Sequence, residues 1–195
     1  MNLYHTLKTL SLDTLNCIAS PVVNDPFTPD TPAIRIMTDF RQTEPVQVQL
    51  DMSLDEAMEL LRRMHVRSGL VTDENGTFKG LVTVADLLSR QVLSIATNQG
   101  LNRSDLTIRD LMIPKQKLSG ISLQTLLQSN VGDLLKTLKQ GGSQYLLVID
   151  DAATAICGII SASDIARKLK IPVDISQRAT SFREIVEIIN SSNGH

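Results

Sequence analysis

The stretch GLVTVADLL at residues 80–88 decides the fold, because the chain repeats its pattern as GIISASDIA at residues 158–166. In both copies an apolar run ends in a hydroxyl side chain, and an aspartate follows three residues later. That order is typical of a strand that leads into the first turn of a helix. The shared positions are Gly80, Thr83 and Asp86 in the first copy and Gly158, Ser161 and Asp164 in the second, all at one constant offset.

The similarity continues upstream of each copy. LVTDENG at residues 70–76 corresponds to LVIDDAA at residues 147–153, and both read as a strand followed by a turn. The first turn contains Asn-Gly, which favours a hairpin because both residues tolerate a positive φ angle. Further upstream, Ser53 and Glu56 form a capping-box pattern before apolar residues at helical spacing, and Asn130 can cap a second such helix. A short helical start around residues 34–38 and 108–112 precedes each unit.

These elements predict an α+β fold made of two tandem β-α-β-β-α repeats. Each repeat alone would expose one apolar face of its sheet, so we expect the two to pack as a pseudo-two-fold pair around one shared core. The expected units are residues 33–100 and 101–171. Residues 1–32 contain four spaced prolines and predict an extended arm. Residues 172–195 predict a further helix and a tail, because Ser181 and Glu184 form another capping-box pattern.

The duplicated motif, a glycine followed by two apolar residues, Thr or Ser, any two residues and Asp, resembles the CBS-domain pair, also called the Bateman module. The resemblance covers about residues 33–171. It implies a regulatory, non-catalytic module that needs no cofactor and binds an adenosine-containing nucleotide such as AMP, ADP, ATP or S-adenosylmethionine between its repeats. It also implies a homodimer. The sequence departs from the family at Leu70 and Leu147, where proline is common, and at Gly69, where a larger residue is usual.

The chemistry of the motif suits such a ligand. A carboxylate can accept two hydrogen bonds and so can hold both ribose hydroxyls, whereas a Thr or Ser hydroxyl beside a helix start can receive a phosphate. The resemblance adds Thr38 and Arg109 as candidate phosphate contacts, and Lys115 and Lys117 fit better as solvated surface charges. The same Thr/Ser and Asp pairs are also ordinary capping boxes, in which they only satisfy the helix.

Several other functions find little support in the sequence. The net charge is −2 and aromatic residues make up 3% of the chain, so it shows neither a basic stripe nor stacking platforms for nucleic acids. It shows no enzyme motif, and Cys17 and Cys157 suggest neither a disulfide nor a zinc site. No apolar run is long enough to span a bilayer, so we expect a cytoplasmic protein. Besides the nucleotide sensor, a ligand-free dimerisation scaffold with an unknown protein partner remains open.

Overall fold

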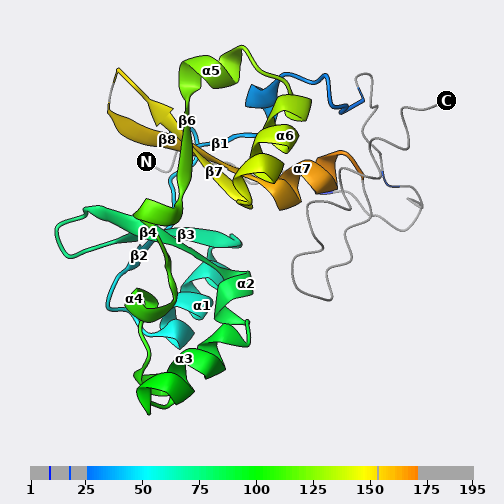
Figure 1. Cartoon of the computed structure of the whole chain (residues 1–195). Helices are drawn as coiled ribbons and strands as arrows, with labels where there is room; N and C mark the ends of the chain where they lie inside the picture. The colour runs from blue at the N-terminus through cyan, green and yellow to red at the C-terminus, as the bar shows by residue number, and fades with distance from the viewer. Residues whose placement is uncertain (1–8, 10–17, 19–25, 153, 171–195) are drawn as a thin grey trace, which may run out of the picture.

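The computed structural model of the protein describes residues 9, 18, 26–152 and 154–170. The helix expected within residues 172–195 and most of the N-terminal arm lie outside these described residues. Within them the chain forms two lobes, which Figure 1 shows one above the other. No helix in these ranges is long and apolar enough to cross a membrane.

The first lobe contains a four-stranded sheet in the order β2-β3-β4-β5. Its strands are β2 (Gln47–Gln49), β3 (Ser68–Thr72), β4 (Phe78–Thr83) and β5 (Ile113–Pro114). Strands β2 and β3 are parallel, and the other pairs are antiparallel. The helices of this lobe lie on the side of the sheet away from the second lobe (Figure 1). They are α1 (Leu54–Arg63), α2 (Val84–Leu87), α3 (Gln91–Gln99), the short η2 (Arg103–Asp105) and α4 (Ile108–Leu111).

The second lobe repeats this arrangement. Its sheet has the order β1-β8-β7-β6, with β6 and β7 parallel and the other pairs antiparallel. The strands are β1 (Thr38–Asp39), β6 (Ser119–Ser122), β7 (Tyr145–Asp150) and β8 (Ala155–Ser161). The helices are η1 (Ala33–Ile36), η3 (Lys115–Lys117), which joins the two lobes, α5 (Leu123–Leu127), α6 (Val131–Gly141) and α7 (Ala162–Lys168). The α+β fold and the two repeats are as the sequence predicts.

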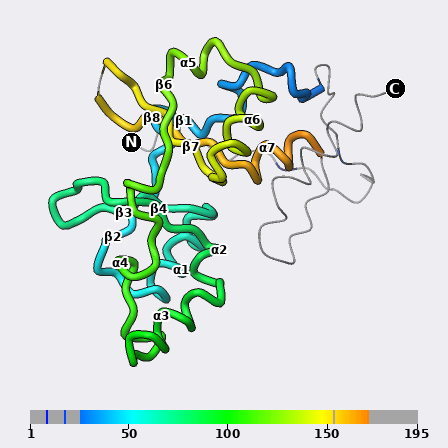
Figure 2. Tube along the Cα trace, in the orientation of Figure 1, coloured from blue at the N-terminus to red at the C-terminus, as the bar shows by residue number. Residues whose placement is uncertain are grey.

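The two repeats exchange their edge strands. Strand β1 lies near the start of the first repeat but pairs with β8 of the second, whereas β5 lies near the start of the second repeat but pairs with β4 of the first. The chain therefore passes from one lobe to the other after β1 and again after β5, as Figure 2 shows along the Cα trace. Each sheet contains a strand supplied by the part of the chain that belongs to the other repeat.

The expected single shared core is wrong, because the structure has two separate core clusters. The first gathers buried residues of α1, α3 and α4 against β2, β3 and β4, among them Leu61, Val71 and Ile108. The second gathers residues of α5, α6 and α7 against β7 and β8, among them Leu134 and Ile160. Each sheet is covered by the helices of its own lobe, so each apolar face is already buried within its lobe. The second cluster also contains Ala33 and Ile36 of η1.

The local signals in the sequence set the helix starts. Ser53 accepts a hydrogen bond from the Glu56 N–H, and the Glu56 carboxylate accepts one from the Ser53 N–H, which completes the predicted capping box of α1. Asn130 and Asp133 form the same box at α6. The predicted hairpin turn is also present, with Gly76 at φ 74°.

The helical segment around and after Asp86 is divided into two short helices. Helix α2 ends at Leu87, and α3 begins at Gln91. Leu87 and Val92 are fully buried, whereas Leu88 and Leu93 are 72% and 63% exposed. The interruption lets the buried residues of two short helices reach the same core, and it leaves two leucines on the surface.

Candidate ligand-binding site

Thr83 and Asp86 form a closed pair where β4 runs into α2. Asp86 Oδ2 accepts hydrogen bonds from the Thr83 hydroxyl at 2.6 Å and from the Thr83 N–H at 3.1 Å. In return, the Asp86 N–H donates to Thr83 Oγ1 at 3.1 Å. Among the described residues, none donates a hydrogen bond to the other carboxylate oxygen, Oδ1. The pair is a capping box that leaves Oδ1 to accept from another partner.

The Asp86 carboxylate is partly removed from water. Burial raises the pKa of Asp86 above its ordinary value, and the hydrogen bonds from the Thr83 hydroxyl and backbone N–H oppose that shift. A half-buried carboxylate gains more from a new hydrogen-bond donor than an exposed one, because less water competes for its oxygens. The free Oδ1 atom of Asp86 is therefore a stronger hydrogen-bond acceptor than the oxygen of an exposed carboxylate.

Thr83 and Asp86 lie on the wall of a cavity of about 430 Å³ between the two lobes. Two kinds of residue complete the wall. Ala85 and Ile113 come from the first lobe, and Lys117 and Leu118 come from η3 and the residue after it, which link the lobes. Residues 141–145 come from the end of α6 and the start of β7 in the second lobe. Residues that are distant in the sequence and belong to both repeats thus form one cavity.

Tyr145 brings an aromatic ring from the second repeat to the motif of the first. Burial and then the negative charge of Asp86 raise the pKa of the Tyr145 phenol, while a hydrogen bond with the Thr83 side chain lowers it. The phenol therefore lies close to both members of the Thr83–Asp86 pair. Nothing in the local sequence pattern indicated a role for Tyr145. One signal beyond that local pattern could have indicated it: Tyr145 is the first residue of the strand that pairs with the second copy of the motif.

The second copy of the motif has different contacts. Ser161 precedes α7, but its side chain caps no helix N–H. Asp164 instead accepts a hydrogen bond from the Arg167 guanidinium at 2.6 Å. Neither Ser161 nor Asp164 lines the 430 Å³ cavity. The expected capping box at Ser161 is therefore wrong, because Arg167 one turn further along the helix takes the carboxylate.

The two motif glycines have a packing role. A Cβ atom at Gly80 would overlap the backbone carbonyl of Ile113 in β5. A Cβ atom at Gly158 would lie 2.7 Å from Met37 Sδ and 2.9 Å from the Thr38 carbonyl oxygen in β1. Each glycine thus allows the exchanged edge strand to approach, and neither lines a described cavity. Gly69, the departure noted in the sequence, faces the core beside Val48 and Leu61.

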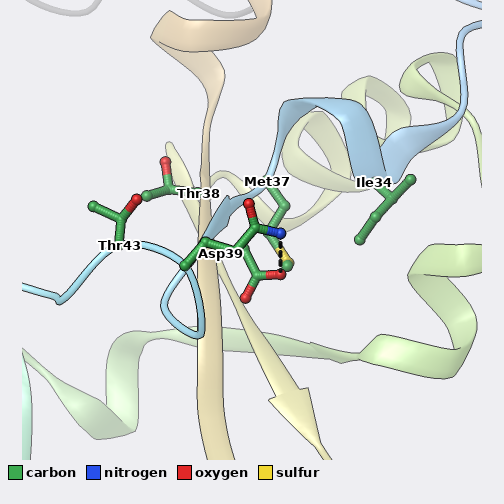
Figure 3. A pocket seen from close by; sticks show the side chains of 6 residues that line it. Ile34, Met37, Thr38, Asp39 and Thr43 are labelled. Atoms are coloured by element: carbon green, nitrogen blue, oxygen red, sulfur yellow. Dashed lines mark hydrogen bonds between the residues drawn. The ribbon is translucent and has the colours of Figure 1, made fainter.

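The two candidate phosphate contacts lie apart from the Asp86 cavity. Arg109 forms an exposed ion pair with Asp51 and does not line that cavity. Thr38 lines a second hollow of about 380 Å³, which Figure 3 shows. Lys117, considered a surface charge on sequence grounds, is exposed but lines the Asp86 cavity. The structure thus brings together Thr83, Asp86 and Lys117 and separates them from Thr38 and Arg109.

The second hollow offers a carboxylate that is already paired. It is lined by Thr38, Asp39, Gln42, Thr43, Ile34 and Met37 (Figure 3). The Arg41 guanidinium donates to Asp39 at 2.7 and 2.8 Å, and the Gln42 amide donates at 3.5 Å. These contacts with Arg41 hold the pKa of Asp39 at about 2. The carboxylate in this hollow is therefore already bound by the Arg41 guanidinium.

The residues that the structure describes contain no group of three or more His, Cys, Asp or Glu side chains that could hold a metal ion. Cys157 is buried and free, and burial raises the pKa of its thiol. A buried thiol with a raised pKa reacts slowly, because the thiolate is the nucleophile.

One family model and several solved structures are similar to this chain. Residues 29–92 match the family model of the CBS domain. An uncharacterized conserved protein from Pyrococcus horikoshii is 19% identical, with a TM-score of 0.53 over 76% of this chain and 99% of that one. The CBS domain of a bacterial CNNM/CorC family Mg²⁺ transporter, solved with an inhibitor, is 18% identical, with a TM-score of 0.52 over 74% of this chain and 79% of that one.

A further solved structure is CBSX2 from Arabidopsis thaliana in complex with AMP, which is 26% identical with a TM-score of 0.47 over 70% of this chain and 93% of that one. None of the curated proteins compared with the chain matches it. Residues 29–92 therefore match the CBS domain, and the fold of the chain is similar to that of the CBS domain of the bacterial transporter.

Proposed function

We propose that this CBS pair is a regulatory module that binds an adenosine-containing nucleotide in the Asp86 cavity. The observation that carries the proposal is the position of the Thr83–Asp86 pair on the wall of a cavity built from both repeats. A ligand in this cavity would touch both lobes at once. It would favour the relative arrangement of the lobes to which it binds more tightly, and so it could regulate a partner.

The cavity has the size and the groups that such a ligand needs. Small-molecule sites commonly measure roughly 300–1,000 Å³, and this one measures about 430 Å³. Asp86 Oδ1 can accept from the ribose hydroxyls, and the Tyr145 ring offers a flat face for the base. Lys117 supplies a positive charge for the phosphate. We assign residues 33–100 and 101–171 to the two repeats of this module.

One observation favours the ligand-free scaffold instead. The Thr83–Asp86 pair already satisfies the start of α2, so its geometry alone does not require a ligand. A thermal-shift panel with AMP, ADP, ATP and S-adenosylmethionine separates the two functions. A ligand that binds only the folded state raises the melting temperature with increasing concentration. No shift with any of the four compounds, confirmed by calorimetry, would favour the scaffold.

The ribose assignment predicts a sugar preference. If Asp86 binds both ribose hydroxyls, the 2′-deoxy form of the best ligand loses one charge-assisted hydrogen bond. Such a bond contributes about 1.5–3 kcal/mol, which corresponds to a weakening of roughly 10- to 100-fold. Isothermal titration calorimetry with the two ligands measures this ratio. Equal dissociation constants would place the sugar away from Asp86.

The exposed leucines predict self-association. Leu88 and Leu93 lie on the outer surface of the first lobe, and a two-fold contact between two copies would cover both. We expect a homodimer at micromolar concentration, with a mass of about twice the 21.4 kDa chain in light scattering. Leu93→Lys should shift the equilibrium toward the monomer, whereas Leu127→Lys, on the other lobe, serves as the matched control. A wild-type mass of one chain would contradict the dimer.

A further inference from the structure

We infer that the pair holds one nucleoside ligand per chain, in the Asp86 cavity, and that Tyr145 of the second repeat is a positioning residue for Asp86. The inference rests on the proposed function, because it concerns how the same cavity recognises its ligand. According to this inference, the Thr83–Asp86 motif binds a ligand and the Ser161–Asp164 motif does not, although the two are equivalent in the sequence. Its basis is the set of contacts that each aspartate makes.

The first difference between the two motifs is the residue that faces them from the other repeat. Tyr145 and Ser68 occupy equivalent places, since each begins the strand that pairs with the motif strand. Ser68 lies opposite Thr83 in the first sheet, and Tyr145 lies opposite Ser161 in the second. Yet Tyr145 lines the cavity of the first motif, together with Thr83 and Asp86. The pseudo-two-fold symmetry of the repeats assigns the corresponding place beside the second motif to Ser68, which has no ring.

The second difference is the state of the carboxylates. The Thr83 hydroxyl donates to Asp86 Oδ2 at 2.6 Å, and this short bond fixes the carboxylate with Oδ1 remaining as an acceptor. The phenol of Tyr145 interacts with the Thr83 side chain and lies close to the Asp86 charge. Tyr145 therefore restrains the hydroxyl that orients Asp86. It acts on the carboxylate through Thr83.

Asp164 has no such support. Ser161 does not bond to it, and Arg167 occupies Oδ1. A ribose at this position would have to displace Arg167 from the carboxylate, and the Tyr145 phenol, which also feels the Asp164 charge, responds more strongly to Asp86. The contacts of the two aspartates thus favour one occupied site over two.

Calorimetry tests the inference with whichever of AMP, ADP, ATP and S-adenosylmethionine binds most tightly. We expect one ligand per chain. Tyr145→Phe keeps the ring and removes the phenol oxygen, so it should weaken binding about 3- to 10-fold, as expected for one neutral hydrogen bond. It should also reduce the preference for ribose over 2′-deoxyribose, which a purely structural loss would not change. Ser68→Ala, the matched control, should alter neither quantity.

Two results would overturn the inference and leave the proposed function intact. One is a stoichiometry of two ligands of equal affinity per chain. The other is a Tyr145→Phe variant with the affinity and sugar preference of Ser68→Ala. If none of the four compounds binds the wild-type protein, the proposed function itself fails.

A measurement without ligand provides an independent check. The chain has two tyrosines, so Tyr4→Phe leaves Tyr145 as the single phenol for titration by ultraviolet absorbance. We expect the pKa of Tyr145 to lie above its ordinary value and to fall more with Asp86→Asn than with Asp164→Asn, because Asp86 is the stronger of the two charge effects. An ordinary pKa, or an equal response to both substitutions, would overturn the proximity on which the inference depends.

Discussion

Asp86→Ala is expected to weaken binding of the adenosine-containing ligand by at least about 100-fold. Two charge-assisted hydrogen bonds to the ribose are lost, and each contributes about 1.5–3 kcal/mol. The fold should survive, because the substitution removes one helix cap at a cost of about 0.5–2 kcal/mol. Calorimetry gives the affinity, and circular dichroism melting gives the stability.

The second motif supplies the matched control for this experiment. Asp164→Ala removes an equivalent carboxylate that is bound to Arg167 and does not line the cavity. We expect it to change the affinity by less than about threefold, a small effect compared with the loss of a hydrogen bond to ligand. The double variant should behave like Asp86→Ala. If Asp86→Ala binds as tightly as the wild type, the ribose assignment is wrong.

Gly80→Ala is expected to be the most destabilising of the small substitutions in the described chain. The added methyl group would overlap the Ile113 carbonyl, a backbone atom that cannot move without displacing β5 from the first sheet. Overpacking of this kind costs about 1–3 kcal/mol and occasionally more. For a chain of this length that corresponds to a fall in melting temperature of roughly 2–4 °C for each kcal/mol. Thermal melting of the ligand-free protein measures it.

Gly141→Ala is the control, because it makes the same chemical change where there is space. Gly141 lies in the last turn of α6, and a Cβ atom there would meet nothing within 4 Å. Replacing a helical glycine by alanine stabilises a helix by about 0.5–1 kcal/mol. The two variants should therefore shift the melting temperature in opposite directions. Equal stability of Gly80→Ala and the wild type would show that β5 does not need the close approach.

Local signals in the sequence predicted much of the fold correctly. The capping boxes at Ser53 and Asn130, the Asn-Gly turn and the duplicated motif each depend on residues within a few positions of one another. For the same reason the sequence predicted the Thr83–Asp86 box. The capping box predicted at Ser161 is absent. The spacing of Asp164 and Arg167, three residues apart on one helix face, could have indicated that Arg167 would bind the carboxylate instead.

The features that depend on long-range contacts could not be predicted in this way. The approach of Tyr145 to Thr83 depends on how the two lobes pack, and the Arg109–Asp51 ion pair joins residues that are 58 positions apart in the sequence. The separate cores follow from helix packing within each lobe, which the repeat pattern alone does not specify. The sequence thus indicated Thr83 and Asp86 of the cavity wall, and only the structure showed that residues 141–145 complete it.

The exchange of edge strands has a consequence for autonomous folding. The CBS-domain match at residues 29–92 contains β1, which pairs with β8, and lacks β5, which completes the first sheet. A fragment cut at these limits would leave Ala33 and Ile36 without the core that buries them. The boundaries of the sequence repeat therefore differ from the boundaries of the folded lobe. Each sheet is completed by a strand that lies more than 30 positions away in the sequence. Such long-range pairing raises the contact order and slows folding. An isolated half would complete its sheet only by borrowing the missing strand from a second molecule.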